Sequence, residues 1–124
     1  MKSDRHAPSL AFPRARRLTR SAEFLRLKAE GRTERGSLLV LAILETGEPG
    51  ECRAGFVTSR RVGGAVVRNR VRRRLREIVR QRQHALRGGI WIVLIARAAA
   101  GRASYRALAD EWLRLARRAS ILAP

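Results

Sequence analysis

Residues 60–80 read RRVGGAVVRNRVRRRLREIVR, and this stretch decides the fold. Its apolar residues recur at the helical period, so they fall on one stripe of an amphipathic helix. The stripe consists of Val67, Val71, Leu75, Ile78 and Val79. Most other positions are arginine, and Glu77 is the only acidic residue between Arg60 and Ala100. We therefore expect a helix with one face in the core and a densely basic outer surface.

The polar side chains of this helix are expected on two flanks of the apolar stripe, because successive residues are about 100° apart. One flank consists of Asn69, Arg72, Arg73, Arg76 and Arg80, and the other of Arg70 and Arg74. Arg68 points along the stripe itself, where a charge is costly unless the helix end overhangs the core. We expect it at the mouth of a groove beside Gly63 and Gly64. The N–H groups at the helix start, with Arg60 and Arg61 just upstream, predict a phosphate-binding seat.

Helices and strands are predicted on both sides of the basic helix. Ser21 is a suitable N-cap for a first helix that stops at Gly31, and the apolar spacing over residues 105–119 predicts a last helix. Strands are predicted at residues 37–45, 52–59 and 90–96. Turn residues at 46–50 predict that the first two strands form an antiparallel hairpin. This order predicts an α+β fold, an α/β sandwich with about three helices on a small mixed sheet of about four strands.

The length and composition fit one domain with a modest core. The chain has 124 residues, of which 45% are hydrophobic, and this is enough to bury a core. Residues 1–13 mix charges with prolines and show no periodicity. We therefore expect a flexible basic tail there, followed by a single domain over residues 14–120.

The net charge is the strongest indication of a partner. The chain has 28 Lys and Arg residues against 10 Asp and Glu, a formal net charge of +18. Like charges repel in a compact body unless a polyanion neutralises them, and each phosphate that a cation contacts adds affinity by releasing counterions. A membrane partner is not expected, because no apolar run approaches the about 20 residues that span a bilayer. The composition therefore predicts binding to nucleic acid.

A cytoplasmic location is expected. Cys52 is the only cysteine, so no intrachain disulfide can form and an intracellular protein is indicated. The first residues carry charges without a following apolar stretch, which is unlike a secretory signal.

No catalytic centre is expected in the protein. A protein nuclease usually presents clustered carboxylates for metal ions or a histidine acid–base pair, whereas the acidic residues here are scattered. The adjacent Asp110 and Glu111 are expected to form surface ion pairs with Arg106 and Arg114, which lie at helical spacing from them. We therefore expect no catalytic residue and no metal ligand.

The register of the basic helix resembles the signature of the bacterial ribonuclease P protein family. In that family, basic residues are followed by a hydrophobe, Gly, a small residue or Asn, Ala-Val, any residue, and Arg-Asn-Arg. The matching positions here include Arg60, Arg61, Val62, Gly63, Ala65, Val66, Arg68, Asn69 and Arg70. Outside the signature, the likeness continues in Arg17, Leu18, Phe24, Gly31, residues 55–59, residues 92–97, Tyr105 and Leu108.

The resemblance implies a fold and a function. It implies that the basic helix is a left-handed crossover between parallel strands, against the usual right-handed rule. It also implies that the chain is the accessory, non-catalytic subunit of an endoribonuclease and pairs one-to-one with the ribonuclease P RNA. That RNA removes the 5′ leader of precursor tRNA with Mg²⁺ bound mainly by the RNA. No further protein partner is expected.

The resemblance also implies two groups of binding residues. The RNA-facing signature consists of Arg60, Arg61, Arg68, Asn69, Arg70, Arg72, Arg73 and Arg76. The leader-binding cleft between the first helix and the sheet is expected to include Arg17, Phe24, Lys28 and Phe56. Lys28 and Ala42 stand where other members have aromatic residues, so leader binding is expected to depend more on charge and less on base stacking. Trp91 and Trp112 are expected in the core.

Two other classes of nucleic-acid-binding protein compete with this interpretation. A structural RNA-binding protein, such as a ribosomal protein, has a similar composition. A DNA-binding module is a weaker alternative, because the sequence has no helix-turn-helix pair, zinc-ligand spacing or zipper. The register of residues 63–70 favours the ribonuclease P family.

Overall fold

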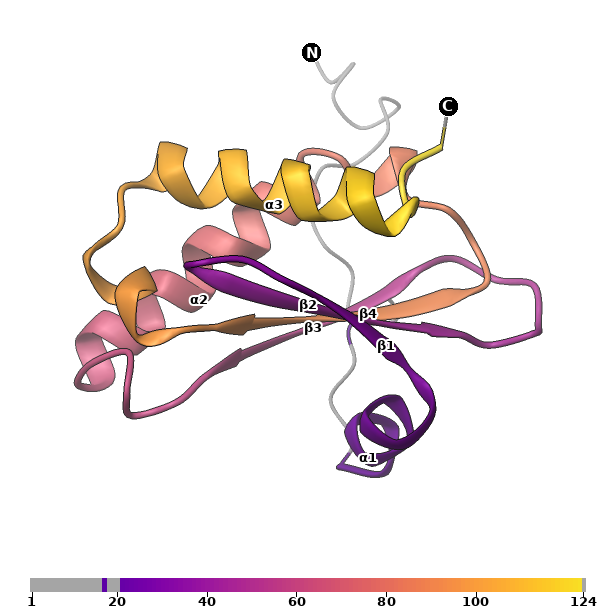
Figure 1. The fold of residues 1–124 in the computed structure, drawn as a ribbon, viewed down its shortest axis with the longest axis horizontal. Helices are drawn as coiled ribbons and strands as arrows, with labels where there is room; N and C mark the ends of the chain where they lie inside the picture. Colours follow the sequence, from indigo (N-terminus) through magenta and orange to yellow (C-terminus); the bar gives the residue numbers. More distant parts are fainter. Residues whose placement is uncertain (1–16, 18–20, 124) are drawn as a thin grey trace, which may run out of the picture.

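The fold is a four-stranded sheet with helices on both faces (Figure 1), seen in a computed structural model that describes Arg17 and residues 21–123. The helices are α1 (Ser21–Glu30), α2 (Ala65–Arg80) and α3 (Tyr105–Ala119). The strands are β1 (Arg32–Arg35), β2 (Leu39–Glu45), β3 (Arg53–Thr58) and β4 (Ile90–Ala96). Two 3₁₀ turns flank β4, η3 (Gln83–Ala85) and η4 (Ala98–Arg102). The predicted α+β class is confirmed, and the tail predicted at residues 1–13 lies outside the described residues.

The strands lie in the order β1-β2-β4-β3, so β4 separates two strands that are neighbours in the sequence. The antiparallel hairpin predicted for residues 37–45 and 52–59 is therefore wrong. β4 pairs antiparallel with β2 and parallel with β3. β2 and β4 are the two strands with nearly continuous apolar residues, and they take the centre of the sheet, where both faces can be covered.

The loop that connects β2 to β3 is hydrogen-bonded to the residue that precedes β4. Thr46 N donates to Gly89 O (2.9 Å), and Gly89 N donates to Gly50 O (2.8 Å). The turn residues predicted at 46–50 are thus present, but they join strands that β4 keeps apart.

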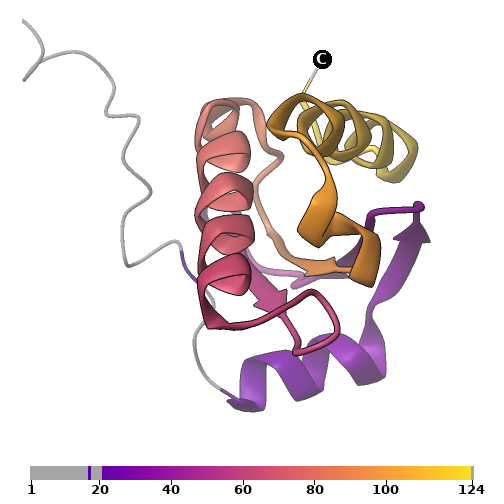
Figure 2. The ribbon, with the colours of Figure 1, turned by 90° about the vertical axis from the view of Figure 1, so that its left-hand side faces the viewer.

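Side chains of the sheet alternate between two clusters, one on each face. Different helices cover the two faces (Figures 1 and 2). Ile92, Leu94 and Ala96 of β4 belong to the main core, which they share with α2 and α3. On the opposite face, called the α1 face below, a smaller cluster joins Leu27 of α1 to Val93. Trp112 of α3 is 1% exposed, so its predicted place in the core is confirmed.

The two longer helices follow their sequence patterns. In α2, Val71, Leu75, Ile78 and Val79 are buried, and Val67 is half-buried against the same core. In α3, Ser104 accepts a hydrogen bond from Ala107 N (3.0 Å) as N-cap, and Ser120 ends the helix with φ 58°. α1 begins at Ser21 and ends before Gly31, where Gly31 N donates to Leu27 O (2.8 Å).

Glu111 holds the turn between β1 and β2, and it is not the surface residue that its sequence pattern predicted. Its side chain is 2% exposed. Oε2 accepts from Leu38 N (2.7 Å) and Leu39 N (2.6 Å), and Oε1 accepts from Ser37 Oγ (3.1 Å). The predicted contact with Arg114 is present at 3.3 Å, but only as an addition to these buried bonds.

α2 connects the parallel strands β3 and β4, as the family resemblance implied. The left hand of this crossover stays a prediction of the resemblance. None of the helices that the structure describes is long and apolar enough to cross a bilayer.

Candidate RNA interface

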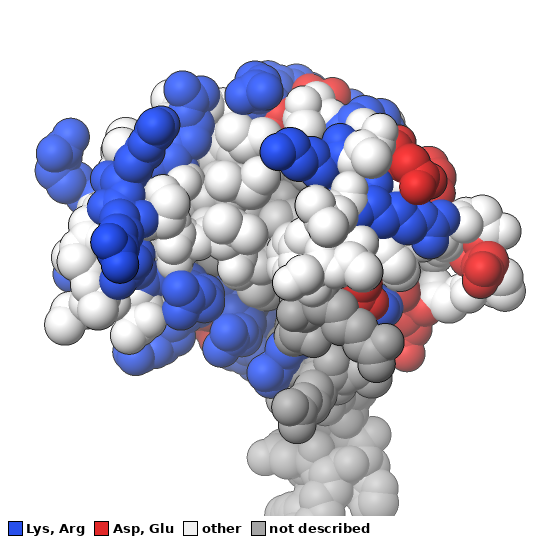
Figure 3. All heavy atoms as spheres, turned by 90° about the horizontal axis from the view of Figure 1, so that it is seen from below, with Lys and Arg blue, Asp and Glu red and all other residues white. Residues whose placement is uncertain are grey.

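Charge is distributed unevenly over the molecule. Figure 3 shows the face seen from below Figure 1, with Lys and Arg side chains along its left and lower edges and Asp and Glu mainly toward the right-hand end. The left-hand end in Figure 1 contains the start of α2, and the right-hand end contains the loop between β2 and β3. A polyanion is therefore attracted to the α2 end of the molecule.

The first flank of α2 faces β3. Arg72 donates from Nη2 to Thr58 Oγ1 (2.8 Å) and from Nη1 to Asn69 Oδ1 (3.1 Å). Asn69 and Arg73 are exposed beside it, while Arg76 is half-buried. The flank that helical spacing predicted is therefore present, and Arg72 ties it to the end of β3.

The second flank of α2 faces η4. Arg70 Nη2 donates to Gly101 O (3.0 Å), and Arg74 Nη1 donates to Ala103 O (3.2 Å). These bonds hold both guanidinium groups close to the backbone that follows β4. The prediction of two separate flanks is confirmed.

Arg17 lies beside the signature residues. It forms an isolated parallel bridge with Ala54 on the outer edge of β3. Burial lowers the pKa of Arg76, and the positive charges of Arg17 and Arg72 lower it further. Arg76 Nε is buried and has no hydrogen-bond partner among the described residues. Three guanidinium groups therefore gather between β3 and α2, an arrangement suited to phosphate.

The start of α2 is open to solvent. Its N-cap, Gly64, provides no side-chain acceptor for the first N–H groups, and no acidic residue lies in the first turn. Arg60 and Arg61 are exposed just upstream, and Arg68 is half-buried in the first turn. The unpaired N–H groups and the positive end of the helix dipole can together bind a phosphate.

Two predicted cleft residues come from α1. Phe24 is half-buried and packs against the cluster on the α1 face, which also contains Ala42. Lys28 is exposed in the last turn of the helix. α1 thus carries both an aromatic ring and a cation, and their role in binding the leader stays a prediction of the resemblance.

Phe56 and Arg17 are placed differently from Phe24. Phe56 packs with the main core on the face of α2 and α3, because it lies opposite Leu94 in the parallel register. Its neighbour Val57 belongs to the α1 face instead. The prediction that places Phe56 in a cleft with Phe24 is therefore wrong, and Arg17 belongs to the group around Arg76.

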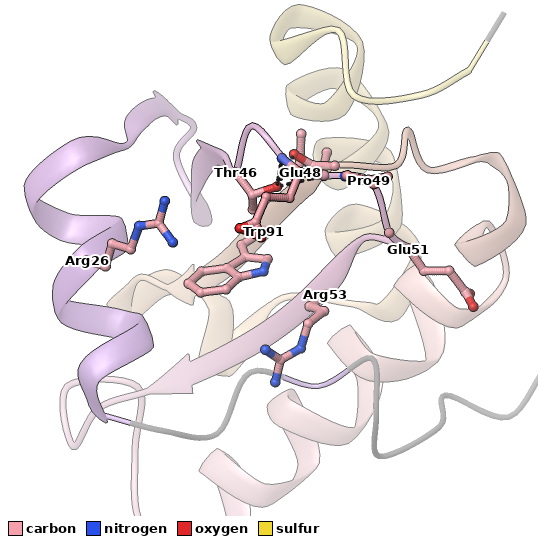
Figure 4. A pocket seen from close by; sticks show the side chains of 10 residues that line it. Arg26, Thr46, Glu48, Pro49, Glu51, Arg53 and Trp91 are labelled. Atoms are coloured by element: carbon pink, nitrogen blue, oxygen red, sulfur yellow. Dashed lines mark hydrogen bonds between the residues drawn. The ribbon is translucent and has the colours of Figure 1, made fainter.

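Trp91 is a candidate binding residue that the sequence analysis assigned to the core. Its ring lies half-buried on the α1 face, with the guanidinium carbons of Arg26 and Arg53 at 5.3 Å and 5.6 Å from the ring centre (Figure 4). The continuous apolar run of β4 concealed this position. Alternation from Ile92 would have separated Trp91 from the main core, because successive strand residues point to opposite faces.

Comparisons with known proteins point to the same family as the signature. The Ribonuclease P family model matches residues 12–120. The chain is 45% identical over 106 residues to the ribonuclease P protein component of Acidothermus cellulolyticus, covering 84% of this chain and 88% of that protein. It is 41% identical over 110 residues to the same component of Gluconacetobacter diazotrophicus, covering 87% and 94%.

Solved structures show the same arrangement of helices and strands. The RNase P protein of Staphylococcus aureus has a TM-score of 0.82 at 23% identity, covering 88% of this chain and 99% of that one. That of Thermotoga maritima has a TM-score of 0.74 at 28% identity, covering 82% and 96%. From the signature, the fold and these similarities together, the chain belongs to the family of bacterial ribonuclease P protein components, subunits of the ribonuclease P endoribonuclease.

Proposed function

We propose that the chain binds the ribonuclease P RNA through α2 and the 5′ leader of precursor tRNA through the α1 face. The observation that carries the proposal is the anchoring of the signature. Arg72 is bonded to Thr58 on one flank of α2, and Arg70 is bonded to Gly101 on the other. Side chains that are ordered before binding lose less conformational entropy when RNA arrives.

The RNA backbone is bound at two places on α2. A phosphate at the helix start accepts from the free N–H groups and contacts Arg60 and Arg61. A second phosphate lies at Arg76, where Arg17 and Arg72 add positive charge. Each contact releases counterions, so the affinity falls steeply with salt.

The leader lies on the α1 face. Phe24 offers an aromatic ring for one base, and Lys28 offers a cation for the backbone. In this arrangement the protein binds both the catalytic RNA and the substrate. Its contribution to the reaction is to hold the two RNAs in position for cleavage.

The chemistry is assigned to the RNA. Within residues 21–123 and Arg17, no three His, Cys, Asp or Glu side chains come together as a metal site would require. We propose that Mg²⁺ is held mainly by RNA oxygen atoms. The excess of arginine then lowers repulsion between the two RNAs, which lets cleavage proceed at low Mg²⁺.

Reconstitution tests the proposal. Purified protein, a bacterial ribonuclease P RNA and a precursor tRNA with a 5′ leader are mixed at low Mg²⁺. We expect release of the leader by the mixture and not by either component alone. A protein that binds these RNAs without promoting cleavage would instead support the structural RNA-binding alternative.

A further inference from the structure

We infer that Trp91 is the stacking platform of an additional RNA-binding site, which takes one unpaired nucleotide. The site, called the Trp91 site below, consists of Trp91, Arg26, Arg53 and the loop at residues 46–51 (Figure 4). This inference rests on the proposed function and adds a site on the α1 face that the family signature does not contain.

The Trp91 site is a preformed cavity. It has a volume of about 350 Å³, within the range of small-ligand pockets. One wall is the loop after β2, where the Thr46 hydroxyl lies within hydrogen-bonding distance of Gly89 O (3.0 Å) and Glu48 O (3.1 Å) and accepts from Glu48 N (3.2 Å). These bonds hold the loop against the start of β4, so the wall is present before any ligand arrives.

The guanidinium groups of Arg26 and Arg53 differ in how firmly their contacts hold them. Arg53 is paired with Glu23, and its Nη2 donates to Arg17 O (2.8 Å), so its position is fixed. Arg26 has one long contact, from Nε to Glu30 (3.5 Å), and its side chain is 42% exposed. Arg26 can therefore turn toward a phosphate while Arg53 keeps its place at the ring.

The chemistry of the cavity favours a nucleotide. An indole ring stacks on a base of any sequence, and arginine adds cation–π and phosphate contacts. The two guanidinium groups disfavour a cationic ligand, and Glu48 and Glu51 in the lining of the same cavity disfavour an acidic protein surface. A single-stranded nucleotide offers a flat base to Trp91 and one phosphate to Arg26, so stacking on the ring, and not the net charge of the site, is the main attraction.

Trp91 shares the α1 face with Phe24 of α1, and both rings pack against the same small cluster. Trp91 pairs with Leu44 of β2 and lies two residues before Val93 on the same face. Its ring therefore lies toward the end of β4 that the loop after β2 contacts.

Intrinsic fluorescence tests the inference on the full chain. Trp112 is buried at 1% exposure, so quenching by a stacked base reports on Trp91. The protein is titrated separately with a single-stranded RNA oligonucleotide of leader sequence and with the ribonuclease P RNA. Quenching by the oligonucleotide identifies the leader as the source of the nucleotide, and quenching by the second RNA alone identifies that RNA. Quenching by neither RNA overturns the inference.

Variants and modified RNA give an independent measurement. We expect Trp91→Leu to weaken binding of the RNA that quenches by between about 5-fold and about 150-fold, and Trp91→Phe by less. For the wild-type chain, abasic substitution should weaken binding strongly at one position of that RNA, because the phosphate remains and only the base is lost. A uniform response to abasic substitution would overturn the inference without using any variant.

Charge is tested with a matched pair of arginines. Arg26 and Arg106 both form ion pairs at i,i+4 spacing on exposed helix faces. We expect Arg26→Gln to weaken binding and Arg106→Gln to leave it within about 2-fold. If wild-type protein supports cleavage but Trp91→Leu binds each RNA normally, only the Trp91 site is wrong. If wild-type protein supports no cleavage, the proposed function fails first.

Discussion

Arg72 in the signature helix donates a hydrogen bond of 2.8 Å to the hydroxyl of Thr58, the last residue of β3. Thr58 is 9% exposed, so this bond fixes the helix to the sheet at a partly buried point. It also holds the Arg72 guanidinium near Arg76, whose pKa it helps to lower. The same contact therefore serves both the packing of α2 and the arrangement of its charges.

Thr58→Val separates these two roles. The variant removes the acceptor but keeps the charge of Arg72, and we expect it to lower the free energy of unfolding by about 1 kcal/mol in urea titrations. RNA affinity should fall less than in Arg72→Ala, which also removes a cation. An equal loss of RNA affinity in both variants would show that the position of the Arg72 guanidinium matters more than its charge.

Arg68→Ala is expected to impair cleavage more than Arg82→Ala. Arg68 is half-buried in the first turn of α2, whereas Arg82 is exposed in the turn that follows the helix. Both variants remove one positive charge, so the comparison isolates position. The measurement is the rate of leader release by the reconstituted complex at low Mg²⁺. Equal rates would leave bulk charge as the only contribution of α2.

Arg76→Met should change stability and binding in opposite directions. Arg76 is partly desolvated beside Arg17 and Arg72, so its charge is unfavourable in the free protein. Methionine has a similar length without that charge, and we expect the free energy of unfolding to rise by up to about 1 kcal/mol at low salt. RNA affinity should fall. A loss of stability at low salt would contradict this view of the cluster.

Glu111→Ala is expected to destabilise the sheet. The substitution leaves the amides of Leu38 and Leu39 without their acceptor, and each unsatisfied buried group costs about 1–3 kcal/mol. Asp110→Ala is the matched control, because Asp110 is the adjacent residue and is 66% exposed. Urea unfolding measures both variants, and similar losses would contradict the buried role of Glu111.

Multivalent anions should stabilise the free protein. The net charge is +18, and any anion that binds only the folded state shifts the equilibrium toward it. We expect sulfate to raise Tm more than chloride does at equal ionic strength. Scanning calorimetry on Arg76→Met provides the control, because part of the gain should be lost with that side chain. Identical Tm values in the two salts would contradict anion binding at α2.

The period of the apolar residues was sufficient to predict α2, which contains the signature, and α3, which packs on the core. The stripe from Val67 to Val79 and the burial of Trp112 follow directly from spacing at 3.6 residues per turn. Strand pairing could not be predicted in the same way. The partners of β4 are set by burial of the most apolar strands at the centre of the sheet, and this depends on residues far apart in the sequence.

The site was predicted less completely than the fold. Helical spacing places the arginines of α2 on two predictable flanks. The face of the sheet on which Phe56 and Trp91 lie depends instead on strand register, where a shift by one residue moves a side chain to the opposite face. β1 has the sequence RTER and no apolar pattern. Its backbone pairing with β2 gives it its place in the sheet, and no local pattern could have indicated this.

The central position of β4 has a consequence for synthesis of the chain on the ribosome. Among the described strands, β3 pairs only with β4, and the whole of α2 is made between them. When β3 emerges, its partner does not yet exist, and parallel pairing across a long insertion is slow. The arginine-rich segment is therefore exposed to RNA before the sheet is complete. If α2 binds RNA as proposed, we expect an RNA that holds this segment helical to shorten the search of β3 for β4, which would couple folding of the protein to assembly with its RNA.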